Sequence, residues 1–144
     1  MNVETPIGSL EAQMQALGDA ARAACQKLAI APSHQKDKAL HAMAESIRNH
    51  TQDLLAANAN DVARTRAAGK ASSFIDRLTL TPERIEAMAK GLEEVAALPD
   101  PVGEVMANWQ RPNGLDLTRV RVPIGVIGII YESRPNVTAD AGAL

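Results

Sequence analysis

Apolar residues recur at spacings of three and four through the first two thirds of the chain, a pattern that predicts amphipathic helices. The cleanest example follows Thr81, Pro82 and Glu83. There a capping hydroxyl, a proline at the first helical position and an acidic side chain together mark a helix start. The buried face of this helix is predicted to comprise Ile85, Met88, Ala89, Leu92, Val95 and Ala96.

Four further segments are predicted to be helical, beginning at Leu10, Ser33, Thr51 and Ser72. Ser33 and Thr51 are the expected N-caps of the second and third helices, and Gly69 is the expected left-handed residue after the third. Within the third helix, the polar run at 58–61 predicts a break or kink, because Asn and Asp side chains compete for nearby backbone groups.

The period changes after residue 98, where two prolines and a glycine within six residues end helical structure. Residues 104–122 predict a β-hairpin whose Asn113-Gly114 turn would supply positive φ angles. The run from Ile124 to Tyr131 is continuously apolar and rich in β-branched residues, which is typical of a strand buried on both faces of a parallel sheet. Such a strand needs neighbours, so we expect either pairing with another chain or a truncated sequence.

The charge and the aromatic content of the chain argue against some classes of function. The chain has 144 residues, 15 Lys and Arg against 17 Asp and Glu, a net charge of −2, and only 2% aromatic residues. Without a cationic patch or stacking platform, general nucleic-acid binding is not expected. The first ten residues lack the pattern of a secretory signal, and an eight-residue apolar run is too short to span a bilayer. We therefore expect a cytoplasmic protein without a membrane partner.

Neither cysteine nor histidine chemistry is predicted. Cys25 is the only cysteine, so no internal disulfide can form, and it lies on the predicted inner face of the first helix as a small apolar residue. His34, His41 and His50 are seven and nine residues apart, whereas a helical zinc pair usually has a spacing of four. We expect surface histidines and no metal site.

The segment from Tyr131 to Thr138 is the best candidate for a ligand site, because it would follow a buried strand and open a helix. Arg134 offers a planar fork for phosphate or carboxylate, and Asn136 offers a neutral amide donor beside a developing oxyanion. A structural turn with solvated charges is the alternative. Gly125 and Gly128 fit either interpretation, since they equally suit close helix packing.

Four ordered blocks resemble the gamma-glutamyl phosphate reductase family (glutamate-5-semialdehyde dehydrogenases) of the aldehyde dehydrogenase superfamily. They lie at 58–62, 76–82, 100–103 and 121–136. The resemblance implies NADPH-dependent reduction of γ-glutamyl phosphate to glutamate 5-semialdehyde and phosphate, the second step of proline biosynthesis. It also implies a nucleophilic cysteine, which Cys25 does not match. We therefore expect an N-terminal segment that is inactive alone.

The resemblance assigns candidate roles to the loop. Asn136 resembles the asparagine whose amide stabilises the oxyanion, although Arg134-Pro135 stands where other superfamily members have an aromatic residue. Glu132 and Arg134 become candidates for binding the amino group and phosphate of the substrate, against the alternative of a supporting salt bridge. The residues expected beside the NADPH cofactor are Tyr131, Ser133 and Pro135.

The expected fold class is α/β, in three parts. Residues 1–103 would form a helical layer of the cofactor-binding lobe, 104–122 an oligomerisation hairpin, and 123–144 the first strand, ligand loop and helix start of a Rossmann-type domain. The implied partners are the small-molecule substrate, further copies of the chain and the glutamate kinase that supplies the substrate. Two alternatives stay open, a non-enzymatic helical interaction module and another superfamily member.

Overall fold

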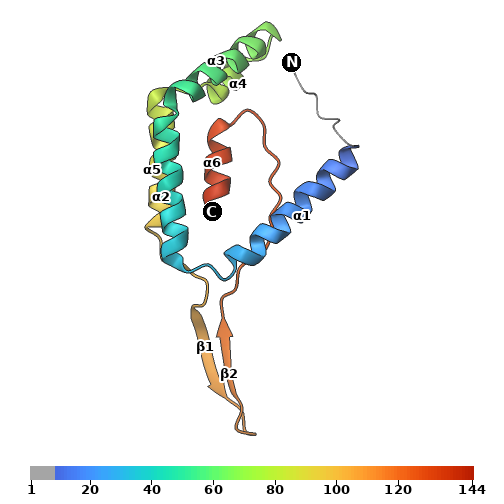
Figure 1. Ribbon diagram of the computed structural model, residues 1–144, viewed down its shortest axis with the longest axis vertical. Helices are drawn as coiled ribbons and strands as arrows, with labels where there is room; N and C mark the ends of the chain where they lie inside the picture. Colours follow the sequence, from blue (N-terminus) through green and yellow to red (C-terminus); the bar gives the residue numbers. More distant parts are fainter. Residues whose placement is uncertain (1–8) are drawn as a thin grey trace. The chain divides into compact units, whose positions relative to one another are not determined.

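The computed structural model describes residues 9–144. Residues 1–8, which hold most of the stretch inspected for a secretory signal, lie outside the described residues. The chain divides into two compact units, Met1–Ala31 with Asp100–Gly128 and Pro32–Pro99 with Ile129–Leu144. Each unit therefore combines segments that are distant in sequence (Figure 1).

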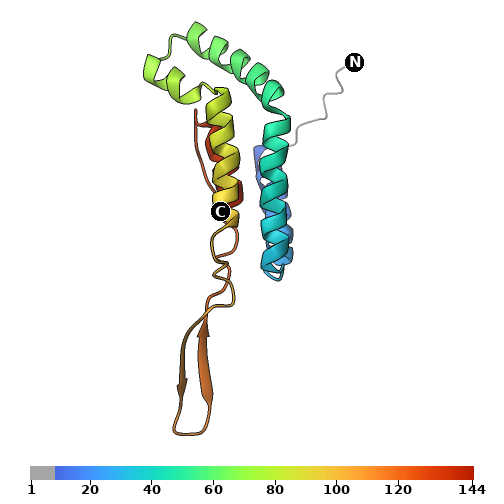
Figure 2. The ribbon, with the colours of Figure 1, turned by 90° about the vertical axis from the view of Figure 1, so that its left-hand side faces the viewer.

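The second unit is entirely helical. Its elements are α2 (Ser33–Asn49), α3 (Thr51–Ala67), α4 (Ser72–Leu78), α5 (Pro82–Ala96) and α6 (Pro135–Ala143). Helices α2 and α5 run side by side, and α6 packs on α5 (Figures 1 and 2). Ala44, Ala89 and Leu92 form the centre of the core, surrounded by the partly buried Leu40, Ile47 and Ala143.

Helix α5 confirms the cleanest sequence prediction. The Thr81 hydroxyl accepts a hydrogen bond from the Arg84 amide at 3.2 Å, and Pro82 is the first helical residue. The buried residues on this helix are Ile85, Met88, Ala89 and Leu92, four of the six predicted. Periodic apolar positions were sufficient here because the whole face packs inside one unit.

The other two predicted caps lie one residue away from their expected positions. Ser33 and Thr51 are the first residues of their helices, and the N-caps are Pro32 and His50. The Thr51 hydroxyl donates instead to the Arg48 carbonyl at 2.7 Å, which ties the start of α3 to the end of α2. Gly69 follows α3 with φ of 68°, so the predicted left-handed residue is confirmed.

The predicted break at 58–61 is wrong, since α3 is continuous through these residues. Asn58, only 7% exposed, does not bond its own backbone. Its amide Nδ2 donates to the Leu78 carbonyl at 2.8 Å, and its Oδ1 accepts from the Leu80 amide at 2.7 Å. The side chain closes the turn between α4 and α5, so the local competition that favours a break does not arise.

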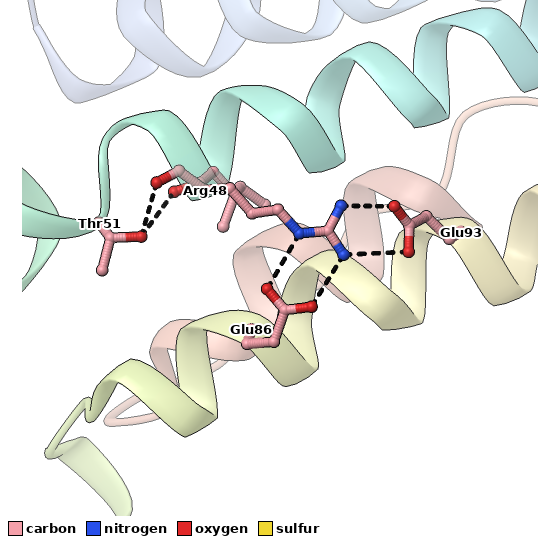
Figure 3. Close-up of polar contacts among 5 residues, drawn as sticks. Arg48, Thr51, Glu86 and Glu93 are labelled. Atoms are coloured by element: carbon pink, nitrogen blue, oxygen red, sulfur yellow. Dashed lines mark hydrogen bonds and ion pairs between the residues drawn. The ribbon is translucent and has the colours of Figure 1, made fainter.

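An ion-pair clamp joins α2 to α5 (Figure 3). The Arg48 guanidinium contacts both oxygens of Glu86 at 2.9 Å and both oxygens of Glu93. Glu86 and Glu93 are seven residues apart, two helical turns, so their carboxylates lie on the same face of α5. Two bidentate contacts fix both the register and the separation of the two helices.

The clamp predicts a pH dependence of stability. Hydrogen bonds from Arg48 lower the pKa values of Glu86 and Glu93 below the ordinary 4.5 in the folded chain. Their contribution to stability is therefore complete above the unfolded-state pKa and is lost as pH falls through the folded-state pKa. We expect the urea midpoint to decrease more steeply below pH 4.5 in the parent chain than in Arg48→Met. Equal slopes would contradict the clamp, and the hairpin variant Arg111→Met serves as control.

The first unit contains α1 (Leu10–Leu28), β1 (Val105–Gln110) and β2 (Asp116–Val120). The predicted helix α1 is confirmed, with the Ser9 hydroxyl accepting from the Ala12 amide at 3.3 Å. Its predicted inner face is not buried within the described residues. The large apolar side chains of that face are all exposed, namely Leu10, Met14, Leu17 and Leu28.

The hairpin at 104–122 is confirmed as an antiparallel pair, with one irregularity between Val105 and Ala107. An Arg121–Glu104 ion pair at 2.8 Å holds its base. The predicted turn geometry is wrong in one respect, because only Gly114 has a positive φ, of 85°, and Asn113 does not. The Arg111 and Leu115 backbones bond across the turn at 2.8 Å, so the five-residue loop needs one left-handed residue.

Residues 121–132 form no strand in the described chain, contrary to the prediction for Ile124–Tyr131. Ile124 and Ile130 are among its most exposed apolar side chains. A strand exists only through hydrogen bonds to a neighbour, and no described segment pairs with this one. No helix among residues 9–144 is long and apolar enough to cross a membrane.

Candidate functional site

The predicted ligand loop leads into α6. Ser133 adopts a left-handed backbone with φ of 59°, and Pro135 occupies the first turn of the helix. Arg134 is the N-cap but provides no side-chain cap. Pro135 has no N–H, and the Val137 N–H donates to the Arg134 carbonyl at 3.0 Å, so the Asn136 backbone N–H is the donor of this first turn that remains for an anion.

An open hollow of about 360 Å³ lies against the start of α6. It belongs wholly to the second unit, with walls from α4, the turn after it, α5 and α6. Its lining residues are Asp76, Arg77, Thr79, Leu80, Arg84, Ala87, Met88, Pro135, Asn136 and Asp140. This volume lies within the range of about 300–1,000 Å³ that is usual for small-molecule sites.

Asn136, the predicted oxyanion-stabilising residue, lines this hollow. Its Nδ2 donates to Asp140 Oδ2 at 2.9 Å, one helical turn further along α6. An amide nitrogen carries two N–H donors, and no second bond from this nitrogen to a described residue is formed. The remaining N–H can therefore donate to a bound group.

Arg84 and Asn58 hold the opposite wall in place. The Arg84 guanidinium donates to the backbone carbonyls of Asp76 and Thr79, the latter at 2.7 Å, and to the Asp76 carboxylate at 3.1 Å. Asn58 bonds the backbone on both sides of Thr79. The turn is thus fixed by side chains from two helices.

The other predicted site residues do not line the hollow. Glu132 and Arg134 are exposed, and neither forms an ion pair with a described residue, so the alternative of a supporting salt bridge is not observed in the part of the chain that the structure describes. The Tyr131 hydroxyl lies 2.6 Å from the Thr138 hydroxyl, and Ser133 is half-buried. The structure therefore brings together Pro135 and Asn136 and leaves the remaining four on the approach to α6.

Sequence reasoning missed four charged residues of the hollow, Asp76, Arg77, Arg84 and Asp140. A usable signal existed for Asp140, since it follows Asn136 by four residues and therefore shares its helical face. Arg77 lies inside one of the quoted family blocks but has no spacing relation to the loop. Arg84 follows the predicted helix start at 81–83 and has no spacing relation to the loop either.

The remaining titratable candidates lie elsewhere. His34, His41 and His50 are exposed, as predicted. Cys25 is a half-buried free thiol on α1, in the first unit, whereas Asn136 belongs to the second. Across residues 9–144, no group of three or more His, Cys, Asp or Glu side chains is placed to hold a metal ion.

Comparisons with known proteins bear on the whole chain. No family model matches it. Gamma-glutamyl phosphate reductase of Parvibaculum lavamentivorans is 64% identical over 131 residues, which cover 91% of this chain and 31% of that protein. The protein of the same name from Allorhizobium ampelinum is 61% identical over 135 residues, or 94% of this chain and 32% of that protein. The chain is homologous to an N-terminal portion of gamma-glutamyl phosphate reductases.

Solved structures agree in fold. The Thermotoga maritima gamma-glutamyl phosphate reductase has a TM-score of 0.83 and 47% identity over 86% of this chain and 30% of that one. The Saccharomyces cerevisiae gamma-glutamyl phosphate reductase has a TM-score of 0.84 and 32% sequence identity, over 90% of this chain and 33% of that one. The helices and hairpin are therefore those of the gamma-glutamyl phosphate reductase fold, and the chain spans about a third of the length of these relatives.

Proposed function

We propose that this chain is the N-terminal part of an enzyme that reduces γ-glutamyl phosphate to glutamate 5-semialdehyde and phosphate, in proline biosynthesis. The observation that carries the proposal is 64% identity over 131 residues to a gamma-glutamyl phosphate reductase. Identity of this extent argues against a helical interaction module, which needs only an apolar pattern. The four family blocks and the hollow beside Asn136 support the same conclusion.

In this function the chain contributes groups that bind and polarise the substrate. The free N–H of Asn136 would donate to the oxygen that gains negative charge, and a neutral amide does so without its own counter-charge. Arg134, exposed and without a described partner, is assigned to the phosphate, for which a guanidinium fork is well shaped. Glu132 is a candidate contact of the substrate on the same loop.

NADPH is the proposed cofactor, and it supplies the hydride when bound. The fit to this chain rests on the start of α6, where no side chain caps the helix and the Asn136 backbone N–H suits a phosphate. Tyr131, Ser133 and Pro135 flank that point and are the residues proposed to hold the cofactor. Their part is to bind and orient it next to Asn136.

The division into three parts, 1–103, 104–122 and 123–144, is kept as part of the proposal. In the longer enzyme, residues 124–131 would become the first strand of the dinucleotide-binding domain, where neighbouring strands would pair with them and bury the exposed isoleucines. The hairpin has exposed apolar residues such as Trp109 and Leu117, which pair across the two strands. This supports oligomerisation through 104–122.

The cellular setting is also part of the proposal. A single cysteine suits a reducing compartment, so the enzyme is placed in the cytoplasm. Its substrate is an acyl phosphate, a reactive group that the glutamate kinase must supply nearby. The kinase is therefore the proposed protein partner, alongside further copies of the chain.

The test is a chimera in which residues 1–144 replace the matching portion of the P. lavamentivorans reductase. We expect phosphate-dependent reduction of NADP by glutamate 5-semialdehyde at a rate within about tenfold of the unaltered reductase, because one decade in rate is only about 1.4 kcal/mol. A chimera that folds and assembles like the unaltered reductase but lacks activity would refute the proposal. The 144-residue chain alone should be inactive.

A further inference from the structure

The charged residues of the hollow differ in how far they are already satisfied. Arg84 is fully engaged by the turn at 76–79. Arg77 also lines the hollow but is exposed and forms no hydrogen bond or ion pair with a described residue. Asp140 accepts one bond, from Asn136, although a carboxylate offers about four acceptor positions. Asp76 is ion-paired with Arg84 at 3.1 Å, so Arg77 and Asp140 are the charged side chains of the hollow that form no ion pair with a described residue.

We propose that this hollow binds the α-amino acid end of the substrate, with Arg77 paired to the α-carboxylate and Asp140 to the α-ammonium. This inference rests on the proposed function and goes further, because it assigns a recognition site for the part of the substrate that does not react. It makes Arg77 and Asp140 specificity-determining residues.

The chemistry of the two groups matches a zwitterion. A guanidinium presents paired N–H donors that fit a carboxylate bidentately. An ammonium has three donors and needs acceptors around it, which Asp140 can supply while it keeps its bond to Asn136.

Asn136 and Asp140 lie one helical turn apart on the same face of α6, and Asn136 Nδ2 is 2.9 Å from Asp140 Oδ2. The second N–H of Asn136 and the unused acceptor positions of Asp140 therefore lie next to each other in the hollow. One ligand lying against this face can contact both side chains, with Asn136 at the reacting carbonyl and Asp140 at the ammonium.

Glu132 is the competing anchor for the ammonium, and its position counts against it. It lies on the loop before α6 and is not among the residues that line the hollow. Asp140 lines the hollow and is tied to Asn136. The geometry therefore favours Asp140 for the ammonium and leaves Arg134 for the phosphate.

The experiment is a ligand titration of the ¹⁵N-labelled 144-residue chain followed by NMR. The probes are L-glutamate, glutarate, which lacks the ammonium, and 4-aminobutyrate, which lacks the α-carboxylate. We expect saturable shifts from L-glutamate at residues 76–88 and 135–140. Binding of either truncated probe should be at least about tenfold weaker, because each lacks one charged group that forms a charge-assisted hydrogen bond.

Variants separate the two assignments. Asp140→Asn keeps a carbonyl oxygen for Asn136 but should lose the preference for L-glutamate over glutarate. Arg77→Gln should lose the preference for L-glutamate over 4-aminobutyrate and retain the preference for L-glutamate over glutarate. The hairpin variant Arg119→Gln should leave both preferences unchanged. A merely structural role would weaken all three probes together.

Several outcomes would overturn the inference. These are no saturable binding of L-glutamate at tens of millimolar, equal binding of the three probes, or a shift of specificity with Glu132→Gln in place of Asp140→Asn. None of them depends on catalysis. An active chimera without this specificity would refute only the subsite, whereas an inactive chimera with it would refute only the reductase function.

Discussion

Replacing Asn136 with alanine should reduce turnover of the chimeric reductase by about 100- to 1,000-fold, the range found when a single oxyanion donor is removed. The side chain is exposed and its one described hydrogen bond is to Asp140, so little of the fold depends on it. The loss should appear in kcat with a small change in KM, because the interaction strengthens as charge develops on the substrate oxygen.

The measurement is steady-state reduction of NADP by the chimera, with thermal unfolding as a check on folding. Asn113→Ala is a matched control, since Asn113 is an exposed asparagine in the hairpin turn. A kcat within about threefold of the parent, less than one kcal/mol, would remove Asn136 from the reacting centre. A loss confined to KM would instead make Asn136 a binding residue.

Leu92→Ala should destabilise the helical unit by about 3 kcal/mol, within the 2–5 kcal/mol typical of a buried Leu→Ala change. Leu92 is 1% exposed and contacts the core formed with Ala44 and Ala89, where alanines leave no large side chain able to fill the cavity. Against total stabilities of about 5–15 kcal/mol, a small unit with few buried residues would lose much of its margin.

Urea titration monitored by circular dichroism at 222 nm measures the effect. Leu98→Ala provides a same-type control just after α5, where the side chain is 61% exposed. The control should change the unfolding free energy by less than about 0.5 kcal/mol. If the two variants had the same urea midpoint, Leu92 could not be a core residue in solution.

Helix positions were predictable because most helices of the second unit, namely α2, α3, α5 and α6, bury residues within that unit. Where the partner is missing from the described residues, the same reasoning failed. Ile124–Tyr131 has the composition of a buried strand but forms none, and the apolar face of α1 is exposed. Composition indicates that a segment is able to form a buried strand or helix face, whereas strand pairing and burial themselves depend on a neighbouring segment.

The candidate site also contains residues that could be predicted from the sequence and residues that could not. Asn136 could be predicted because a strand–loop–helix pattern and a family resemblance both point to the start of α6. Arg77 could not, because it reaches the hollow through a fold in which α4 and α6 are more than fifty residues apart in sequence. Only the packing of α6 on α5 reveals that these segments share a cavity.

Asn58 has a consequence for how the chain can vary. Its two partners are the carbonyl of residue 78 and the amide of residue 80, groups that almost every amino acid carries. Substitutions at either position leave the contact intact, except for proline at 80, which has no N–H. Correlated substitutions among relatives would therefore not reveal this contact. The contact joins residues twenty positions apart and holds the turn that forms one wall of the hollow. Only the constancy of one asparagine would record it.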